Sequence, residues 1–179
     1  ACLKGVEASA FSGGNVVLGP NSLVALTTGT NNVGLGTDAL TSVNEGIGNV
    51  AVGHQAVDSV TTGSHNIGIG LSALNATAGA ASYNIGIGDS SLGVNADGSY
   101  SIGIGTGALN STTGTGNTAL GSSSGQANGA GTYNTLVGYG SDVIGASLTN
   151  ATAIGYLAKV SASNSLVLGA TEANQVNVG

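Results

Sequence analysis

Short segments of alternating apolar residues recur along the whole chain at a nearly constant spacing. In each, a polar residue is followed by an apolar residue, a small one, a second apolar one and a glycine, as in Asn66-Ile-Gly-Ile-Gly70. Ten copies align, and their closing glycines are Gly19, Gly36, Gly53, Gly70, Gly88, Gly105, Gly121, Gly138, Gly155 and Gly169. Apolar residues at every second position are typical of a strand with one buried face. The pattern therefore predicts ten short strands in a repeat protein.

The rest of each repeat is less apolar. A second apolar element begins three positions after the closing glycine, as in Ala39-Leu40 and Ala73-Leu74, and a stretch rich in Gly, Ser, Thr and Asn follows. Those residue types favour turns and loops. We therefore predict that each repeat contains a strand, a glycine corner, a second strand and a polar loop without a third apolar side.

Stacking these turns about 4.8 Å apart satisfies the backbone hydrogen bonds of every strand except those at the two ends. The fold class that follows is all-β, a parallel β-roll or solenoid of about ten 17-residue turns over residues 15–169. Residues 1–14 are expected to cap the first turn, with Phe11 as the cap. Residues 170–179, with alternating Val176 and Val178, are expected to form one more strand that leads onward. We expect the sequence, which starts at Ala1 without Met, to be a fragment or a processed product, and the native protein to continue after residue 179.

Two columns of residues mark fixed positions in the repeat. We expect each closing glycine to stand at a corner with positive φ, which glycine enters without a Cβ penalty. These corner glycines comprise Gly36, Gly53, Gly70, Gly88, Gly105, Gly121, Gly138 and Gly155. The opening asparagines either stack as an amide ladder or form turns independently of one another. They comprise Asn32, Asn49, Asn66, Asn84, Asn117 and Asn134.

The middle residue of each pentapeptide is uncharged in every copy and points away from its two apolar neighbours. We expect the apolar pair, such as Ile67 and Ile69, to line the interior of the roll. The middle residues, such as Gly68, then form an uncharged stripe on the outside. Soluble monomers rarely expose a long apolar patch, so we expect this stripe to be buried in a homo-oligomer with cyclic symmetry.

The repeated motif resembles the head repeats of trimeric autotransporter adhesins, the YadA-like heads. The resemblance covers about Asn15 to Gly169 and is clearest in Asn150–Ala158, Asn164–Gly169 and Asn117–Gly121. Similar repeats occur in fibres of tailed bacteriophages. The resemblance implies a left-handed parallel β-roll that trimerises into a fibre segment for adhesion or receptor binding. The adhesin repeats are shorter than most turns here, and only the last interval, from Gly155 to Gly169, has their length. The longer loops favour the phage-fibre version.

Composition and charge exclude several classes of protein. Glycine accounts for 33 of 179 residues and charged residues for only 6%. Two Lys, no Arg and eight Asp and Glu give a net charge of −6. The chain thus lacks the cations that neutralise a nucleic-acid backbone or an anionic membrane surface. It also has no apolar run long enough for insertion into a membrane.

The inventory of reactive residues predicts no enzyme, no cofactor and no metal. The segment Gly68–Ala73 fits a dinucleotide fingerprint, but that motif must open a helix, and here the same string recurs without helical periodicity. His54 and His65 lie in different columns without further ligands at metal-binding spacing. Three alternatives stay open: a polysaccharide depolymerase with carboxylates paired between subunits, calcium at the trimer axis, and an ice-binding solenoid. The last is raised by a short threonine column, Thr118, Thr135 and Thr152.

Aromatic residues fall into two columns. His65, Tyr83, Tyr100 and Tyr133 each precede the opening residue of a repeat, whereas Tyr139 and Tyr156 follow the closing glycine. Exposed tyrosines suit stacking on sugars or packing against a protein receptor. Alternatively, these rings cover loop backbones or seal a cleft between subunits.

Together these patterns predict a non-enzymatic, homotrimeric attachment fibre segment that binds a cell-surface glycan or protein receptor. The location that goes with this function is the surface of a virion or of a bacterial cell. The main alternative is a purely structural fibre spacer.

Overall fold

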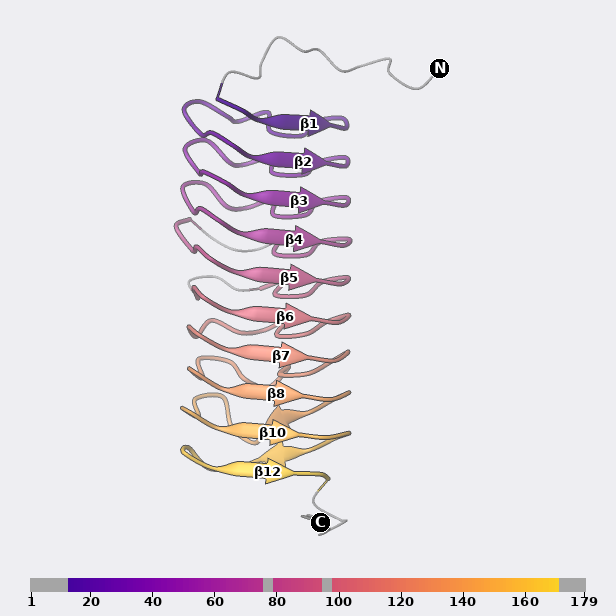
Figure 1. Cartoon of the computed structure of the whole chain (residues 1–179), viewed down its shortest axis with the longest axis vertical. Helices are drawn as coiled ribbons and strands as arrows, with labels where there is room; N and C mark the ends of the chain where they lie inside the picture. Colours follow the sequence, from indigo (N-terminus) through magenta and orange to yellow (C-terminus); the bar gives the residue numbers. More distant parts are fainter. Residues whose placement is uncertain (1–12, 76–78, 95–97, 171–179) are drawn as a thin grey trace.

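The computed structural model describes residues 13–75, 79–94 and 98–170, and in this part of the chain it is a parallel β-solenoid without helices. Ten three-residue strands stack into one sheet along the long axis (Figure 1). This architecture, with one strand in every repeat, confirms the predicted fold class. The strands are β1 (Val16–Leu18), β2 (Val33–Leu35), β3 (Val50–Val52), β4 (Ile67–Ile69), β5 (Ile85–Ile87), β6 (Ile102–Ile104), β7 (Thr118–Leu120), β8 (Thr135–Val137), β10 (Thr152–Ile154) and β12 (Leu166–Leu168).

The coil is left-handed. From β1 downward in Figure 1, each strand runs to the right on the near side, and the chain returns on the far side before the next strand begins. Neighbouring strands pair residue for residue, as Ile67 does with Ile85 and Ile69 with Ile87. Equivalent residues therefore form straight columns along the axis, and the loops absorb the small differences in length between repeats.

The corner after each strand brings the backbones of successive turns close together. Gly88 has a φ of +122°, and a Cβ added to it would lie 2.7 Å from the carbonyl carbon of Gly105. Both the backbone angle and the lack of space therefore require glycine here. The other corner glycines from Gly19 to Gly155 have φ between +124° and +141°.

The prediction of which strand residues face inward is wrong. The middle residue of each strand faces the interior, where Ala51, Ala119 and Ala153 are fully buried. The flanking apolar pair faces outward, and Ile69 and Leu120 are exposed to 38% and 48%. A period of two separates two faces without saying which is buried. The interior is too narrow for an aliphatic pair, because a side chain from the opposite side of the turn already fills it.

That opposite side carries one large residue in most turns. Leu92 is fully buried, and its Cγ lies 3.2 Å from the position that a Cβ on Gly103 would take. Leu74 Cγ stands in the same relation to Gly86, also at 3.2 Å. A strand glycine thus makes room for a leucine of the preceding turn, which fills the space between the sheet and the opposite side.

The predicted second strand is absent from most of the described turns. Leu40, Leu74 and Leu92 have φ between +50° and +55°, which is incompatible with an extended strand. Their amides still bond to the next turn, as Leu40 N–H does to the Ala56 carbonyl at 3.0 Å. In the part of the chain that the structure describes, only β9 (Asp142–Val143) and β11 (Lys159–Val160) form a two-stranded parallel sheet on this side.

The expectation that the loop lacks an apolar side is also wrong. Val43 and Val60 are fully buried in the core, and Leu26 packs against it. In the first turns the core is thus filled from three sides. Phe11 and the strand predicted around Val176 and Val178 lie outside the described residues.

Candidate functional site

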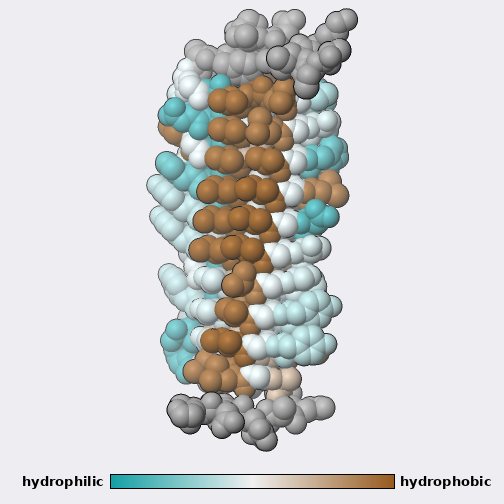
Figure 2. Space-filling model, turned by 45° about the vertical axis from the view of Figure 1, so that its right-hand side comes forward, coloured by the Kyte–Doolittle hydropathy of each residue, from teal (hydrophilic) through white to brown (hydrophobic). Residues whose placement is uncertain are grey.

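The outward residues of the ten strands form a continuous surface that we call the apolar stripe. It has two columns, which run straight along the axis because the strands pair in register. Figure 2 shows it as a band along the whole described length of the solenoid. Its first column comprises Val16, Val33, Val50, Ile67, Ile85, Ile102, Thr118, Thr135, Thr152 and Leu166. Its second column comprises Leu18, Leu35, Val52, Ile69, Ile87, Ile104, Leu120, Val137, Ile154 and Leu168.

The apolar stripe is open to solvent and narrows along its length. Its side chains are half-buried or exposed, and Leu18 and Leu166 reach 49% and 61%. Over β1 to β6 both columns are aliphatic, whereas threonine occupies the first column in β7, β8 and β10. Figure 2 shows the same narrowing from a wide to a narrow band.

A second surface lies at the edge of the solenoid where the chain enters each strand, and we call it the aromatic column. It consists of His65, Tyr83, Tyr100 and Tyr133. The rings of His65 and Tyr83 are parallel with centroids 4.9 Å apart, and those of Tyr83 and Tyr100 are 5.1 Å apart at 4°. The structure thus brings three of the four residues into one continuous stack.

Gly116 interrupts the aromatic column between Tyr100 and Tyr133. The Tyr133 ring leans over this glycine, because its Cδ1 lies 2.6 Å from the position that a Cβ on Gly116 would take. Within the stack, both faces of the Tyr83 ring are covered by neighbouring rings. Tyr83 therefore presents its ring edge and hydroxyl group to solvent rather than an open face.

The backbone holds each aromatic residue in the left-handed region, with φ of 59°, 62°, 60° and 56° for His65, Tyr83, Tyr100 and Tyr133. Two ladders of side chains flank this strained position. The first is the asparagine column, in which Asn66 N–H donates to Asn49 Oδ1 at 2.9 Å and Asn66 Nδ2 donates to the Ala81 carbonyl at 2.9 Å.

The asparagine ladder is buried and nearly continuous. Asn32, Asn49, Asn66 and Asn84 are linked side chain to backbone in sequence, and all are fully buried. Ser101 replaces asparagine in one turn and still accepts a hydrogen bond from Asn117 N–H, at 3.2 Å. The ladder then resumes from Asn117 to Asn134.

A hydroxyl ladder on the other side of the aromatic column was missed by the sequence analysis. Ser64 N–H donates to Ser82 Oγ at 3.0 Å, and Ser82 N–H donates to Ser99 Oγ at 3.1 Å. These bonds run from each turn to the next, opposite in direction to the backbone-to-asparagine bonds. The signal was visible as a Ser or Thr two positions before most pentapeptides. The two ladders together fix the aromatic residue between them.

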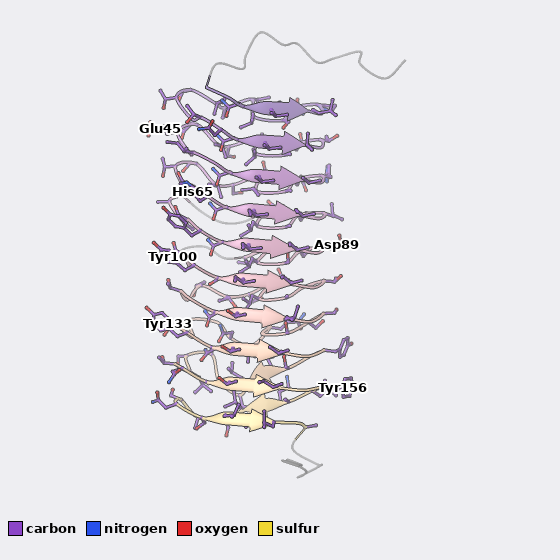
Figure 3. The ribbon with its side chains drawn as sticks, in the orientation of Figure 1. Glu45, His65, Asp89, Tyr100, Tyr133 and Tyr156 are labelled. Carbon is purple, nitrogen blue, oxygen red and sulfur yellow. The ribbon has the colours of Figure 1, made fainter. Side chains whose placement is uncertain are left out.

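Tyr139 and Tyr156 form a separate pair. Their ring centroids are 5.7 Å apart at 17°, and both rings are more than half exposed. Figure 3 shows Tyr156 at the edge opposite to His65, Tyr100 and Tyr133. The six aromatic residues singled out in the sequence therefore belong to two surfaces on opposite edges of the solenoid.

Some of the described charged side chains contact one another within the chain. His54 Nε2 lies 3.7 Å from Asp38 Oδ2 at the surface. The buried Asp142 accepts hydrogen bonds from the amides of Ala127 and Val143, and Lys159 Nζ lies 3.4 Å from its Oδ2. In the described part of the chain, no three His, Cys, Asp or Glu side chains are grouped so that they would hold a metal ion.

Comparison with protein-family models, with curated proteins and with solved structures found no match to this chain. Among the residues that the structure describes, no helix has the length and hydrophobicity needed to cross a membrane.

Proposed function

We propose that this chain is a segment of a non-enzymatic, homotrimeric attachment fibre that binds a glycan or protein receptor on a cell surface. Its location would be the surface of a virion or of a bacterial cell. The observation that carries the proposal is the apolar stripe, which runs along the full described length of the solenoid. The likeness of the repeat to trimeric adhesin heads and phage fibres agrees with it.

The size of the apolar stripe argues for a partner. Ten strands about 4.8 Å apart give a length of about 43 Å, and two columns of side chains are about 10 Å wide. The resulting area, on the order of 400 Å², equals that of the largest apolar patch on a typical monomer, roughly 300–600 Å², and such patches are often functional. Aliphatic side chains gain free energy on leaving water, so burial of this face stabilises an assembly.

The shape of the apolar stripe argues that the partner is a copy of the same chain. Each strand contributes one rank to the stripe, which is its pair of outward side chains. These ranks are evenly spaced along the axis, and a second solenoid of the same pitch offers matching ranks over the whole length. Three such faces close around one axis and bury every stripe without leaving an open end, as cyclic symmetry requires. The aromatic column lies beside the sheet rather than on it, and supports contact with a receptor.

The chemistry of the aromatic column supports receptor binding through edges and hydroxyls. The rings of His65, Tyr83 and Tyr100 are held by backbone ladders and by stacking, so little conformational entropy is lost when a ligand binds. Tyrosine hydroxyls donate and accept hydrogen bonds, and their rings present apolar edges. Sugars and protein loops both offer complementary groups.

Light scattering of the purified chain tests the assembly. The expected mass is three times the 16.9 kDa of one chain. Ile69→Asp and Ile104→Asp, introduced together, place charges on the apolar stripe and are expected to yield folded monomers. Thr28→Asp and Thr62→Asp, on exposed loop positions, form the matched control and are expected to leave the mass unchanged. A wild-type chain that remains monomeric at micromolar concentration overturns the proposal.

Binding to glycan arrays and host cells tests the receptor function. Tyr83→Ala, Tyr100→Ala and Tyr133→Ala, combined in one folded trimer, are expected to abolish binding. Tyr139→Ala and Tyr156→Ala on the opposite edge serve as the control and are expected to preserve it. If the wild-type trimer binds no glycan and labels no host cell, the chain is a fibre spacer.

A further inference from the structure

Evenly spaced ranks raise a problem of alignment. If each rank of the apolar stripe were aliphatic, two copies displaced by one turn would bury nearly the same surface as two copies in register. A reversed copy would do so as well. An assembly with one structure therefore needs a feature that differs from rank to rank.

The three threonines of the first column are such a feature. Thr118 pairs with Thr135, and Thr135 with Thr152, so that they occupy consecutive strands of the sheet. They are half-buried, and none of their hydroxyls forms a hydrogen bond within the described chain. Elsewhere in both columns the residues are Val, Ile or Leu. In the free chain these hydroxyls are solvated by water.

We propose that Thr118, Thr135 and Thr152 fix the register and the parallel orientation of the copies that pack through the apolar stripe. This inference rests on the proposed homotrimer. In a parallel cyclic assembly in register, each threonine lies at the same height as its counterpart in the neighbouring chains. Hydroxyl groups then meet hydroxyl groups, a pairing that Thr132 and Thr149 make within the chain at 3.2 Å.

A shift of one turn loses this pairing at the two ends of the threonine block, and a reversed copy loses it at all three threonines. A shift of one turn places a threonine level with Ile102 or with Leu166, at the two ends of the threonine block. A reversed copy places the block opposite Val33, Val50 and Ile67. A hydroxyl that is buried against aliphatic side chains has lost its water without gaining a partner. Each mispaired threonine lowers the population of that arrangement by about tenfold.

The same principle operates in coiled coils, where one polar residue in the apolar seam selects the register at some expense of stability. Threonine and valine have the same shape, so a Thr→Val change removes the hydroxyl and leaves the packing of the strand intact. Valine also favours strands. The triple variant Thr118→Val, Thr135→Val and Thr152→Val therefore isolates the contribution of the three hydroxyls.

Spin-label distances between chains measure the register. In a Cys2→Ser background, one batch of chains carries a nitroxide at Thr28→Cys and another at Ser161→Cys, and the two are mixed before assembly. These exposed positions lie near opposite ends, so the distance between the two labels runs mainly along the axis. A shift of one turn changes this distance by about 5 Å. A reversed copy brings labels from opposite ends to the same height.

The wild-type trimer is expected to give narrow peaks in the distribution of distances between the spin labels. The triple valine variant is expected to add peaks displaced by about 5 Å or to bring the two labels together. The control carries Thr62→Val and Thr113→Val, which remove hydroxyls from exposed loop positions, and it is expected to match the wild type. A further variant moves the block by adding Val33→Thr, Val50→Thr and Ile67→Thr to the triple valine variant, and it is expected to restore narrow peaks.

The outcomes separate the two proposals. A triple valine trimer with the same narrow peaks as the wild type overturns the role of the threonines and leaves the trimer standing. A wild-type chain that light scattering shows to be monomeric overturns both. A folded trimer in which the moved threonine block fails to narrow the peaks also contradicts the inference.

Discussion

Leu136 and Gly125 face each other across the core, with the large residue in the strand and the glycine on the opposite side. In the earlier turns these two positions are reversed. Leu136 Cδ1 lies 3.0 Å from the position that a Cβ on Gly125 would take. In the earlier turns the leucine stands opposite the sheet and the glycine in the strand, as with Leu92 and Gly103. Both arrangements place one large side chain in the same narrow space, which shows that the volume of a turn is conserved while its source varies.

This exchange predicts compensation between two substitutions. Leu136→Gly leaves a cavity and is expected to destabilise the chain by about 2–5 kcal/mol. Gly125→Leu overfills the core and is expected to cost about 1–3 kcal/mol. The double variant restores the pattern of the earlier turns, in which leucine adopts similar positive φ. Urea unfolding at fixed chain concentration is expected to show a coupling of at least about 1 kcal/mol between the sites. Strict additivity would contradict this reading of the core.

Two glycines separate backbone strain from lack of space. Gly88 and Gly145 have nearly equal φ, +122° and +127°, but a Cβ on Gly145 would meet no atom within 4 Å. Gly145→Ala is expected to cost about 1–3 kcal/mol from strain alone. Gly88→Ala is expected to cost more, because its Cβ would collide with the backbone of the next turn. Equal losses in thermal unfolding would mean that close stacking at the corner is unimportant.

The asparagine ladder predicts a graded response at Asn66. Its Oδ1 accepts from Asn84 N–H at 3.1 Å, and its Nδ2 donates to the Ala81 carbonyl. Asn66→Ala leaves the Asn84 N–H and the Ala81 carbonyl without these partners and is expected to cost about 3 kcal/mol of unfolding free energy. Asn66→Ser keeps an acceptor, as Ser101 does in its own turn, and is expected to cost less. Chemical denaturation of both variants ranks them, and a serine variant as unstable as the alanine variant would refute the ladder's contribution.

Ser91 is a site where a substitution is expected to stabilise the protein. Its Oγ is buried and has no hydrogen-bond partner within the described residues, and alanine stands at the equivalent positions 73 and 108. Ser91→Ala is expected to raise the free energy of unfolding by about 1 kcal/mol. Ser124→Ala is the matched control, because Ser124 Oγ donates to the Gly121 carbonyl at 2.8 Å. That change is expected to destabilise the chain by about 1 kcal/mol, and the two effects must therefore differ in sign.

The repeat made the solenoid and much of its local chemistry predictable from the sequence. A pentapeptide that recurs at a nearly constant interval dictates where each strand and corner lies, because the spacing alone brings equivalent residues into columns. The stacking of His65, Tyr83 and Tyr100 follows from the same spacing. The hydroxyl ladder through Ser64 and Ser82 obeys the same spacing. It was not predicted, because serine in a loop is explained more simply as a turn residue.

The alternation of Ile67, Gly68 and Ile69 defined two faces of a strand but not which face is buried, since a period of two is the same viewed from either side. Only the folded chain decided this, because Val57 and Leu74 reach the strand glycines from the opposite side of the turn and already fill the space next to the sheet. The sequence by itself determined the columns. The tertiary structure decided which columns meet solvent, and thereby placed the aliphatic residues expected in the core on the outer face of the sheet.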